Sequence, residues 1–331
     1  MLSRVADSIY WMSRYIERAE NVARFVDVNL NLMLDFPGGS AQQWQPLVDI
    51  TGDTEDFAER FGQAADERSV IGFLTFDTKN PNSILSCFRA ARENARSVRE
   101  IISSSMWEHL NQAYLMLTAA ARRGEVRDPH ELFSSVKTAS HTFIGVTDTT
   151  MTHGEAWHFC RLGRQLERAD KTSRILDVKY FLLLPTVDDI GTTVDDVQWA
   201  AVLRSASAFE MYHKRHGRIV PSRIVEFLLL DYDFPRAIHH SLKAARESVH
   251  AISGTPVAMF RSPVEQLLGL LCSELAYAQV DELIAGGLHE YLDSLQTKMN
   301  QIGVHIHDTF FSGRGAVAKR PPRLRADVVA S

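Results

Sequence analysis

Cysteine is scarce in this chain of 331 residues: Cys87, Cys160 and Cys272 share no C-x-x-C or Cys/His ligand spacing. A disulfide framework is therefore excluded, and the pattern predicts reduced core thiols in a reducing compartment. Long apolar runs are also lacking, since no stretch approaches the roughly 20 apolar residues that span a bilayer. The first residues show no basic stretch followed by an apolar one, as a signal peptide would. These absences together predict a cytoplasmic protein.

A large excess of charge is missing as well. The chain has 36 Lys and Arg against 41 Asp and Glu, with 45% hydrophobic residues, which is typical of a globular protein of one large or two medium domains. An acidic chain does not favour a general phosphate-binding surface, so nucleic acid is an unlikely partner. The motifs G-x-x-x-x-G-K-[ST], G-x-G-x-x-G and G-x-S-x-G are absent, which removes the usual signatures of P-loop, dinucleotide-binding and hydrolase chemistry. No cofactor is indicated.

What the chain does contain is a repeat of itself. Residues 14–28 recur as residues 164–178, with an Arg, a Glu-Arg-Ala-acid run, a second Arg and an Asp-Val pair at the same spacing. Further matches follow in the same order, among them Gln43-Trp44 with Gln198-Trp199 and Ala90-Ala91-Arg92-Glu93 with Ala244-Ala245-Arg246-Glu247. We interpret this order as a tandem duplication of about 150 residues per copy. The predicted divisions are a helical repeat over residues 1–150 and a second over 151–311.

Each repeat is predicted to be helical. From Met12 to Leu30, apolar residues follow the 3- and 4-residue spacing of an amphipathic helix, and the short apolar runs 70–76 and 224–230 are assigned to helix because no alternating pattern elsewhere supplies a sheet. Helices are predicted up to Pro37-Gly38-Gly39 and over residues 70–76, 83–123, 155–184 and 224–230. The expected fold is all-α: a tandemly duplicated helical bundle with two related halves packed as one body.

The last twenty residues differ from the rest. Residues 312–331 carry five basic side chains against the single acid Asp327, together with Gly and Pro. They are predicted to form a basic flexible tail, for which a solvated terminus is the ordinary role. The alternative is nucleic-acid association through the tail, with steeply salt-dependent binding that is lost when the tail is removed.

The two matching blocks carry the candidate site. On a helical wheel, the polar residues of the first block lie opposite its apolar stripe, and the second block reproduces the arrangement. Three interpretations stay open: a solvated face with i,i+4 pairs, a buried ion-pair network between helices, or two quasi-symmetric binding sites. Arginine suits the last two, because its planar donors hold a carboxylate or phosphate in bidentate fashion. The candidate binding residues of the blocks are Arg14, Glu17, Arg18, Glu20, Arg24, Arg164, Glu167, Arg168, Asp170 and Arg174.

Other polar residues are weaker candidates. The pairs Arg92-Glu93 and Arg246-Glu247 are predicted on another helix of each copy, either as surface pairs or facing the first set across the bundle. His153 and Glu155 precede the second block and can line a polar site. No metal site is predicted, because neither His153 with His158 nor His305 with His307 has a spacing that brings both rings to one helix face.

Several segments resemble the bacterial alpha-E family. They are residues 1–21, which read MLSRVADSIYWMSRYIERAEN, and later residues at 91–96, 106–108, Asn111 and 154–170. The resemblance covers nearly the whole chain to about Phe311. It implies an all-helical protein whose relatives are commonly encoded beside, or fused to, circularly permuted ATP-grasp amide ligases and transglutaminase-like peptidases. The family's glutamate and arginine signature corresponds here to Glu17, Arg18, Glu167 and Arg168, with no established reaction attached to it.

Two hypotheses for function follow. The first is a helical accessory partner of an ATP-grasp-type amide ligase system that binds the ligase or its peptide product through the duplicated Arg/Glu faces. The resemblance implies the circularly permuted ATP-grasp ligase and the transglutaminase-like protein as its partners, and the missing nucleotide motif favours a non-ATPase role. The alternative is an enzyme of peptide synthesis or modification, with Glu17 or Glu167 as general acid/base and neighbouring Arg residues as clamps. A homo-oligomer formed through apolar helix faces stays open.

Overall fold

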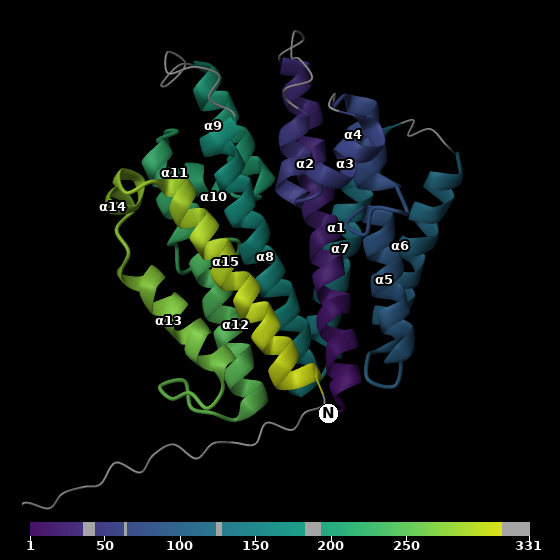
Figure 1. Ribbon diagram of the computed structural model, residues 1–331. Helices are drawn as coiled ribbons and strands as arrows, with labels where there is room; N and C mark the ends of the chain where they lie inside the picture. Colours follow the sequence, from purple (N-terminus) through teal and green to yellow (C-terminus); the bar gives the residue numbers. More distant parts are fainter. Residues whose placement is uncertain (36–43, 63–64, 124–127, 183–192, 313–331) are drawn as a thin grey trace, which may run out of the picture.

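The computed structural model describes residues 1–35, 44–62, 65–123, 128–182 and 193–312, and within these ranges it contains helices and no strand (Figure 1). The all-α prediction is therefore confirmed. The elements are α1 (Ser3–Asp35), α2 (Gln45–Thr51), α3 (Thr54–Phe61), α4 (Glu67–Thr75), α5 (Ile84–Ser97), α6 (Ser104–Arg123), α7 (Pro129–Thr150), α8 (Glu155–Leu182), α9 (Thr193–Ser205), α10 (Phe209–His216), α11 (Pro221–Leu229), α12 (Ile238–Ser253), α13 (Pro263–Tyr277), α14 (Val280–Ala285), α15 (Leu288–Ile306) and the short π-helix η3 (His307–Phe311). None of these helices is long and apolar enough to cross a membrane.

Two long helices, α1 and α8, pack against each other at the centre of the molecule (Figure 1). Helices α5 and α7 pack on α1, and α12 and α15 pack on α8. Two shorter helices cross over, because α2 packs on α8 and α9 packs on α1. The two central helices are therefore enclosed by helices from both ends of the chain.

The central helices approach closely at Gly163. A Cβ atom at this position would lie 2.3 Å from the carbonyl oxygen of Tyr10 on α1, so only glycine fits. This contact brings the polar residues that follow on both helices within reach of each other.

Because neighbours cover α1 on several sides, its burial does not follow a single apolar stripe. Ile9, Met12 and Ile16 are buried, as the periodicity predicts, but Glu17 and Glu20 are equally buried. A helical wheel assumes that a helix has one buried and one solvated face. A helix with neighbours on several sides has no such solvated face.

The helix starts use local polar side chains. Ser83 accepts a hydrogen bond from the backbone of Ser86 at the start of α5, and Asp128 precedes Pro129 at the start of α7 and accepts from Glu131. At α13, Ser262 and Glu265 form a reciprocal capping box. Such caps satisfy backbone donors that a helix start leaves unpaired.

Most of the predicted helices are present. Residues 70–76 and 224–230 fall almost wholly in α4 and α11. The predicted helix over 83–123 is interrupted, since α5 ends at Ser97 and α6 begins at Ser104. Val98 and Ile102 are buried in that connection and anchor the turn to the core. The predicted stop at residues 37–39, the end of the 155–184 segment and the tail after Ser312 lie outside the described residues.

Cys87, Cys160 and Cys272 are buried and free, as predicted. Burial raises the pKa of Cys160 and of Cys272 to about 11. These thiols are therefore protonated at neutral pH and lack the thiolate character of a nucleophile.

Candidate functional site

Glu17 on α1 is held by an arginine from the other central helix. Nε of Arg168 donates to Oε1 at 2.7 Å and Nη2 donates to Oε2 at 2.9 Å, so the contact is bidentate. Nη1 of Arg236 donates to Oε1 at 3.3 Å. Glu17 is 1% exposed, which makes this an interior ion pair rather than a surface one.

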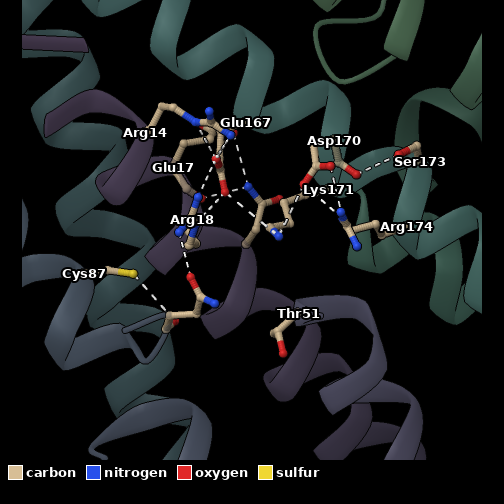
Figure 2. Close-up of polar contacts among 12 residues, drawn as sticks. Arg14, Glu17, Arg18, Thr51, Cys87, Glu167, Asp170, Lys171, Ser173 and Arg174 are labelled. Atoms are coloured by element: carbon tan, nitrogen blue, oxygen red, sulfur yellow. Dashed lines mark hydrogen bonds and ion pairs between the residues drawn. The ribbon is translucent and has the colours of Figure 1, made fainter. Parts of the chain in front are cut away.

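Glu167 on α8 has the reciprocal arrangement. Nε of Arg18 donates to Oε1 at 2.7 Å and Nη2 donates to Oε2 at 3.0 Å, while Nε of Arg14 donates to Oε2 at 2.8 Å. Figure 2 shows both guanidinium groups directed at this carboxylate. Each central helix therefore carries one Glu-Arg dipeptide, and the two dipeptides bind each other. The glutamate of each dipeptide binds the arginine of the other.

Intrahelical pairs flank these two contacts. Arg24 donates to Glu20 one turn earlier on α1, and Nε of Arg174 lies 3.1 Å from both carboxylate oxygens of Asp170 on α8. These are the i,i+4 pairs that the spacing predicts. Nη2 of Arg236 lies 3.1 Å from Oε2 of Glu20 and links the flanking pair to Glu17.

The network continues outward from Arg18 through the amide of Asn82 to the carboxylate of Asp53. Nη1 of Arg18 donates to Oδ1 of Asn82 at 2.6 Å, and Nδ2 of Asn82 donates to Oδ1 of Asp53 at 2.7 Å. The guanidinium is thus shared between a carboxylate on α8 and an amide just before α5, which leaves the buried charge well solvated by protein groups.

The arginines decide the protonation state of the two central acids. Burial alone raises the pKa of Glu17, but the charges of Arg168 and Arg236 outweigh this effect and lower it below its ordinary value of 4.5. For Glu167, burial is again opposed by Arg18 and Arg14, and its pKa also falls below the ordinary value. Both carboxylates are therefore ionised at neutral pH.

These shifts predict acid sensitivity with a definite sign. A carboxylate whose pKa is lower in the folded than in the unfolded state contributes stability above about pH 4.5, and the contribution is lost as the pH falls toward the folded value. We expect the free energy of unfolding, measured by urea titration, to fall from pH 6 to pH 3. The slope should be shallower in a Glu167→Gln variant, and equal slopes would contradict a native-state ion pair.

The remaining candidates lie away from this network. Nε of Arg92 donates to Asn111 on α6, and Glu93 is exposed. Glu247 lies 2.8 Å from Nη2 of Arg161, near the start of α8, so it contacts the central helix but not the Glu-Arg pairs. His153 stacks on Trp157 with ring centroids 4.2 Å apart.

Three more candidates are also outside the paired centre. Arg164 is largely buried, and its nearest acid is Asp148 at 4.0 Å. Glu155 is exposed at the start of α8, and Arg246 is half-buried on α12. Among the described residues, the inter-helix hydrogen bonds of the second Arg/Glu pairs are those of Arg92 to Asn111 and of Arg161 to Glu247.

Several contributors escaped sequence reasoning. Pro235 matches Pro81 in the sequence repeat, and the residue after it is Arg236 in one case and Asn82 in the other. Comparison of the two matching segments therefore does not point to an arginine at this position. Lys171, 3.4 Å from Asp170, corresponds to Asn21 in the first block. The matching positions of the two blocks hold different polar residues, and only tertiary packing identifies those that join the network.

A second reciprocal feature lies further along the central helices. Nδ1 of His130 on α7 lies 2.6 Å from Oδ1 of Asp27, and Nδ1 of His289 on α15 lies 2.7 Å from Oδ1 of Asp177. Asp27 and Asp177 are the matching acids of the two blocks. His130 and His289 lie outside the two matching blocks, so comparison of the blocks does not identify them.

Fold and site together define an all-helical protein organised around two interlocked, buried Glu-Arg pairs. The chain belongs to the alpha-E family, whose model matches residues 1–311 and is described as a predicted alpha-helical domain with a conserved ER motif. The resemblance noted from the sequence is thereby confirmed. Of the Glu-Arg dipeptides in this chain, those at 17–18 and 167–168 contain the buried glutamates, whereas Glu59 and Glu67 are exposed.

Curated relatives include proteins of Mycobacterium bovis and Mycobacterium tuberculosis, each described only as uncharacterised. Identity is 24% over 323 residues, covering 88% of this chain and 34% of each relative. The chain thus spans about a third of the length of the curated relatives it matches. No solved structure matches it.

Proposed function

We propose that this protein is a helical accessory component of an ATP-grasp-type amide ligase system, which binds the ligase or a peptide product and works with a transglutaminase-like protein. Membership in the alpha-E family supports the proposal. So does the length of the mycobacterial relatives, in which the matching part is one third of a longer chain and accompanies further sequence. The observation that carries it is the buried Glu-Arg network, which makes a rigid platform of the two central helices.

The burial of this network bears on one part of the binding hypothesis. Glu17, Glu167 and Arg168 are each less than a tenth exposed, and their charges are satisfied by one another. They fix the arrangement of the helices and leave direct contact to other residues. Outside the network, and apart from the largely buried Arg164, the exposed or half-buried members of the predicted set are Arg92, Glu93, His153, Glu155, Arg246 and Glu247, and we assign partner contact to them.

We further propose that the two halves arose by tandem duplication, with the boundaries near residues 150 and 311. The reciprocal Glu-Arg pairs support this origin, because two equivalent helices related by a two-fold rotation contact each other in that way. The turns agree: Gly52 and Ser207, each eight residues after a matched tryptophan, have φ of +81° and +49°. Positive φ is uncommon for serine, so its occurrence at the matching turn supports the register.

The environment of the glutamates does not favour the alternative of general acid/base catalysis. A catalytic acid or base has a pKa near the working pH and a free path to its substrate. Glu17 and Glu167 instead have lowered pKa values, and arginines occupy both oxygens of each carboxylate. We therefore assign these two residues a positioning role within the protein.

Affinity purification from the native cells tests the accessory role. The tagged wild-type protein is expected to retain an ATP-grasp ligase or a transglutaminase-like protein, identified by mass spectrometry. A Glu93→Arg bait, changed at an exposed position of α5, should retain it about tenfold less, since reversing a rim charge replaces attraction with repulsion.

The matched control is Glu210→Arg, an equal charge reversal at an exposed glutamate of α10 outside the predicted set. It should retain the partner as the wild type does, with unchanged circular dichroism in every bait. A wild-type bait that retains neither class of protein contradicts the accessory role. Equal losses in both variants contradict the assigned surface.

A further inference from the structure

A cavity of about 370 Å³ lies beside the Glu-Arg network, between α1, α8, α15 and η3. Its volume is within the range of small-molecule sites. Its lining includes Tyr10, Trp11 and Arg14 of α1, Asp170 of α8 and Phe311 of η3. No function described above uses this cavity.

The walls of the cavity are aromatic. The rings of Tyr10 and Phe311 lie 5.4 Å apart, and the indole of Trp11 lies 4.9 Å below the guanidinium carbon of Arg14. Aromatic rings that line a cavity favour contact with the face or edge of a planar apolar group. The ligand that fits therefore has an aromatic or flat apolar body.

The ion-pair cluster behind the cavity lining carries a surplus of positive charge. Arg14 and Asp170 are the members of this cluster that line the cavity, and the described members of the whole cluster are four basic and two acidic residues: Arg14, Arg18, Lys171 and Arg174 against Glu167 and Asp170. The carboxylate of Asp170 is already neutralised by Arg174 and Lys171. Asp308 follows the lining residue His307 and is 63% exposed, so water screens its charge far more than it screens the buried cluster.

Arg14 has donors left for a ligand. A guanidinium carries five N–H groups, and the contacts of Arg14 to Glu167 and Tyr10 take one on each nitrogen. Within the described part of the chain, one N–H on each terminal nitrogen remains. Its side chain lines the cavity and is 17% exposed, which is the basis for placing a ligand on these hydrogens.

The corresponding place in the other half is closed. The cavity lined by Glu17, Cys160 and Arg164 measures only about 10 Å³, room for one water molecule at most. When α7 and α15 are aligned so that His130 matches His289, Ile144 matches Gly303. Ile144 lines the small cavity and Gly303 lines the large one. Glycine in place of isoleucine opens one cavity, so the space is a feature of this half and not a by-product of the fold.

We propose that this cavity binds a small organic anion with an aromatic body, the anionic group on the free N–H groups of Arg14 and the ring against Trp11 and Phe311. The argument is independent of the accessory role. A carboxylate in this position offsets part of the positive surplus of the cluster behind the cavity.

The test fills the cavity without disturbing the network. A Cβ at Gly303 meets no atom within 4 Å, so Gly303→Leu projects into the open space. The matched control is Gly145→Leu on α7, where a Cβ also meets no atom within 4 Å. The probes are the anionic phenylacetate, the neutral benzyl alcohol and the cationic benzylamine. Binding is measured by calorimetry and by the change in tryptophan fluorescence. A Trp11→Phe variant identifies the part of the fluorescence that comes from Trp11.

Phenylacetate is expected to bind the wild type and Gly145→Leu equally, and Gly303→Leu at least about tenfold more weakly. Benzyl alcohol and benzylamine should bind at least about tenfold more weakly than phenylacetate, because only the anion meets the charge of Arg14. Absence of phenylacetate binding at about 10 mM overturns the proposal. So does binding that Gly303→Leu leaves unchanged, or benzylamine binding as tight as that of phenylacetate.

Discussion

Replacing Glu167 with glutamine is expected to destabilise the protein by about 3–5 kcal/mol, the range for removing one partner of a buried ion pair. The variant leaves Arg14 and Arg18 charged and buried against a neutral amide. Because a domain is stable by about 5–15 kcal/mol, the loss is a large part of the total. Urea unfolding followed by circular dichroism measures it.

Glu93→Gln is the matched control for this variant. Glu93 is 45% exposed and pairs with surface arginines, so the same chemical change should alter the free energy of unfolding by less than about 1 kcal/mol. If Glu167→Gln cost no more than the control, the carboxylate would not be the buried partner of two arginines.

Gly163→Ala is expected to destabilise by about 1–3 kcal/mol, as overpacking does in a tight interior. The added methyl would lie 2.3 Å from the carbonyl oxygen of Tyr10, a backbone atom that cannot move aside alone. Relief requires α1 and α8 to separate, which lengthens the contacts of Arg14 and Arg18 to Glu167. Thermal and urea unfolding both report the change.

Gly145→Ala is the control, since it lies within α7 and its Cβ meets open space. Alanine is favoured over glycine in a helix by roughly 0.5–1 kcal/mol, so this variant should be slightly more stable than the wild type. The two alanine substitutions are thus expected to have opposite signs. The same sign in both would contradict the close approach at Gly163.

The helices were predictable because their signals are local. Apolar spacing, capping residues and good helix formers occur within a few residues of one another, and the short runs 70–76 and 224–230 were assigned correctly by the lack of any sheet pattern. The break between α5 and α6 was missed, because residues 98–103 contain no Pro or Gly to mark it. Burial of Val98 and Ile102, a tertiary effect, sets that turn.

The candidate site was predictable in composition and not in connectivity. Repetition identified Glu17, Arg18, Glu167 and Arg168 as a set, and the i,i+4 spacing identified the flanking pair of Arg24 and Glu20. The exchange of partners between α1 and α8 depends on how two helices separated by about 150 residues cross. No pattern within either block encodes that crossing.

The main effect of the reciprocal Glu-Arg pairs is to specify how α1 and α8 pack, and their net contribution to the free energy of unfolding is the smaller effect. Well-packed apolar residues can replace a buried ion pair at little or no cost, whereas breaking one partner is expensive. Any slip of α1 along α8 would separate Glu17 from Arg168 and Arg18 from Glu167 together. We therefore expect the network to fix the register in which the surface and the cavity are presented.

The central claim is that the Glu-Arg dipeptides bind across the two helices, and a double-mutant cycle tests it most directly. Arg18→Met and Glu167→Met form the cross-helix cycle, and Glu17→Met with Arg18→Met forms the cycle between sequence neighbours. The account predicts a coupling energy of about 1–3 kcal/mol for the cross-helix pair and a clearly smaller one for the neighbours. A coupling in the neighbours that equals or exceeds that of the cross-helix pair would contradict it.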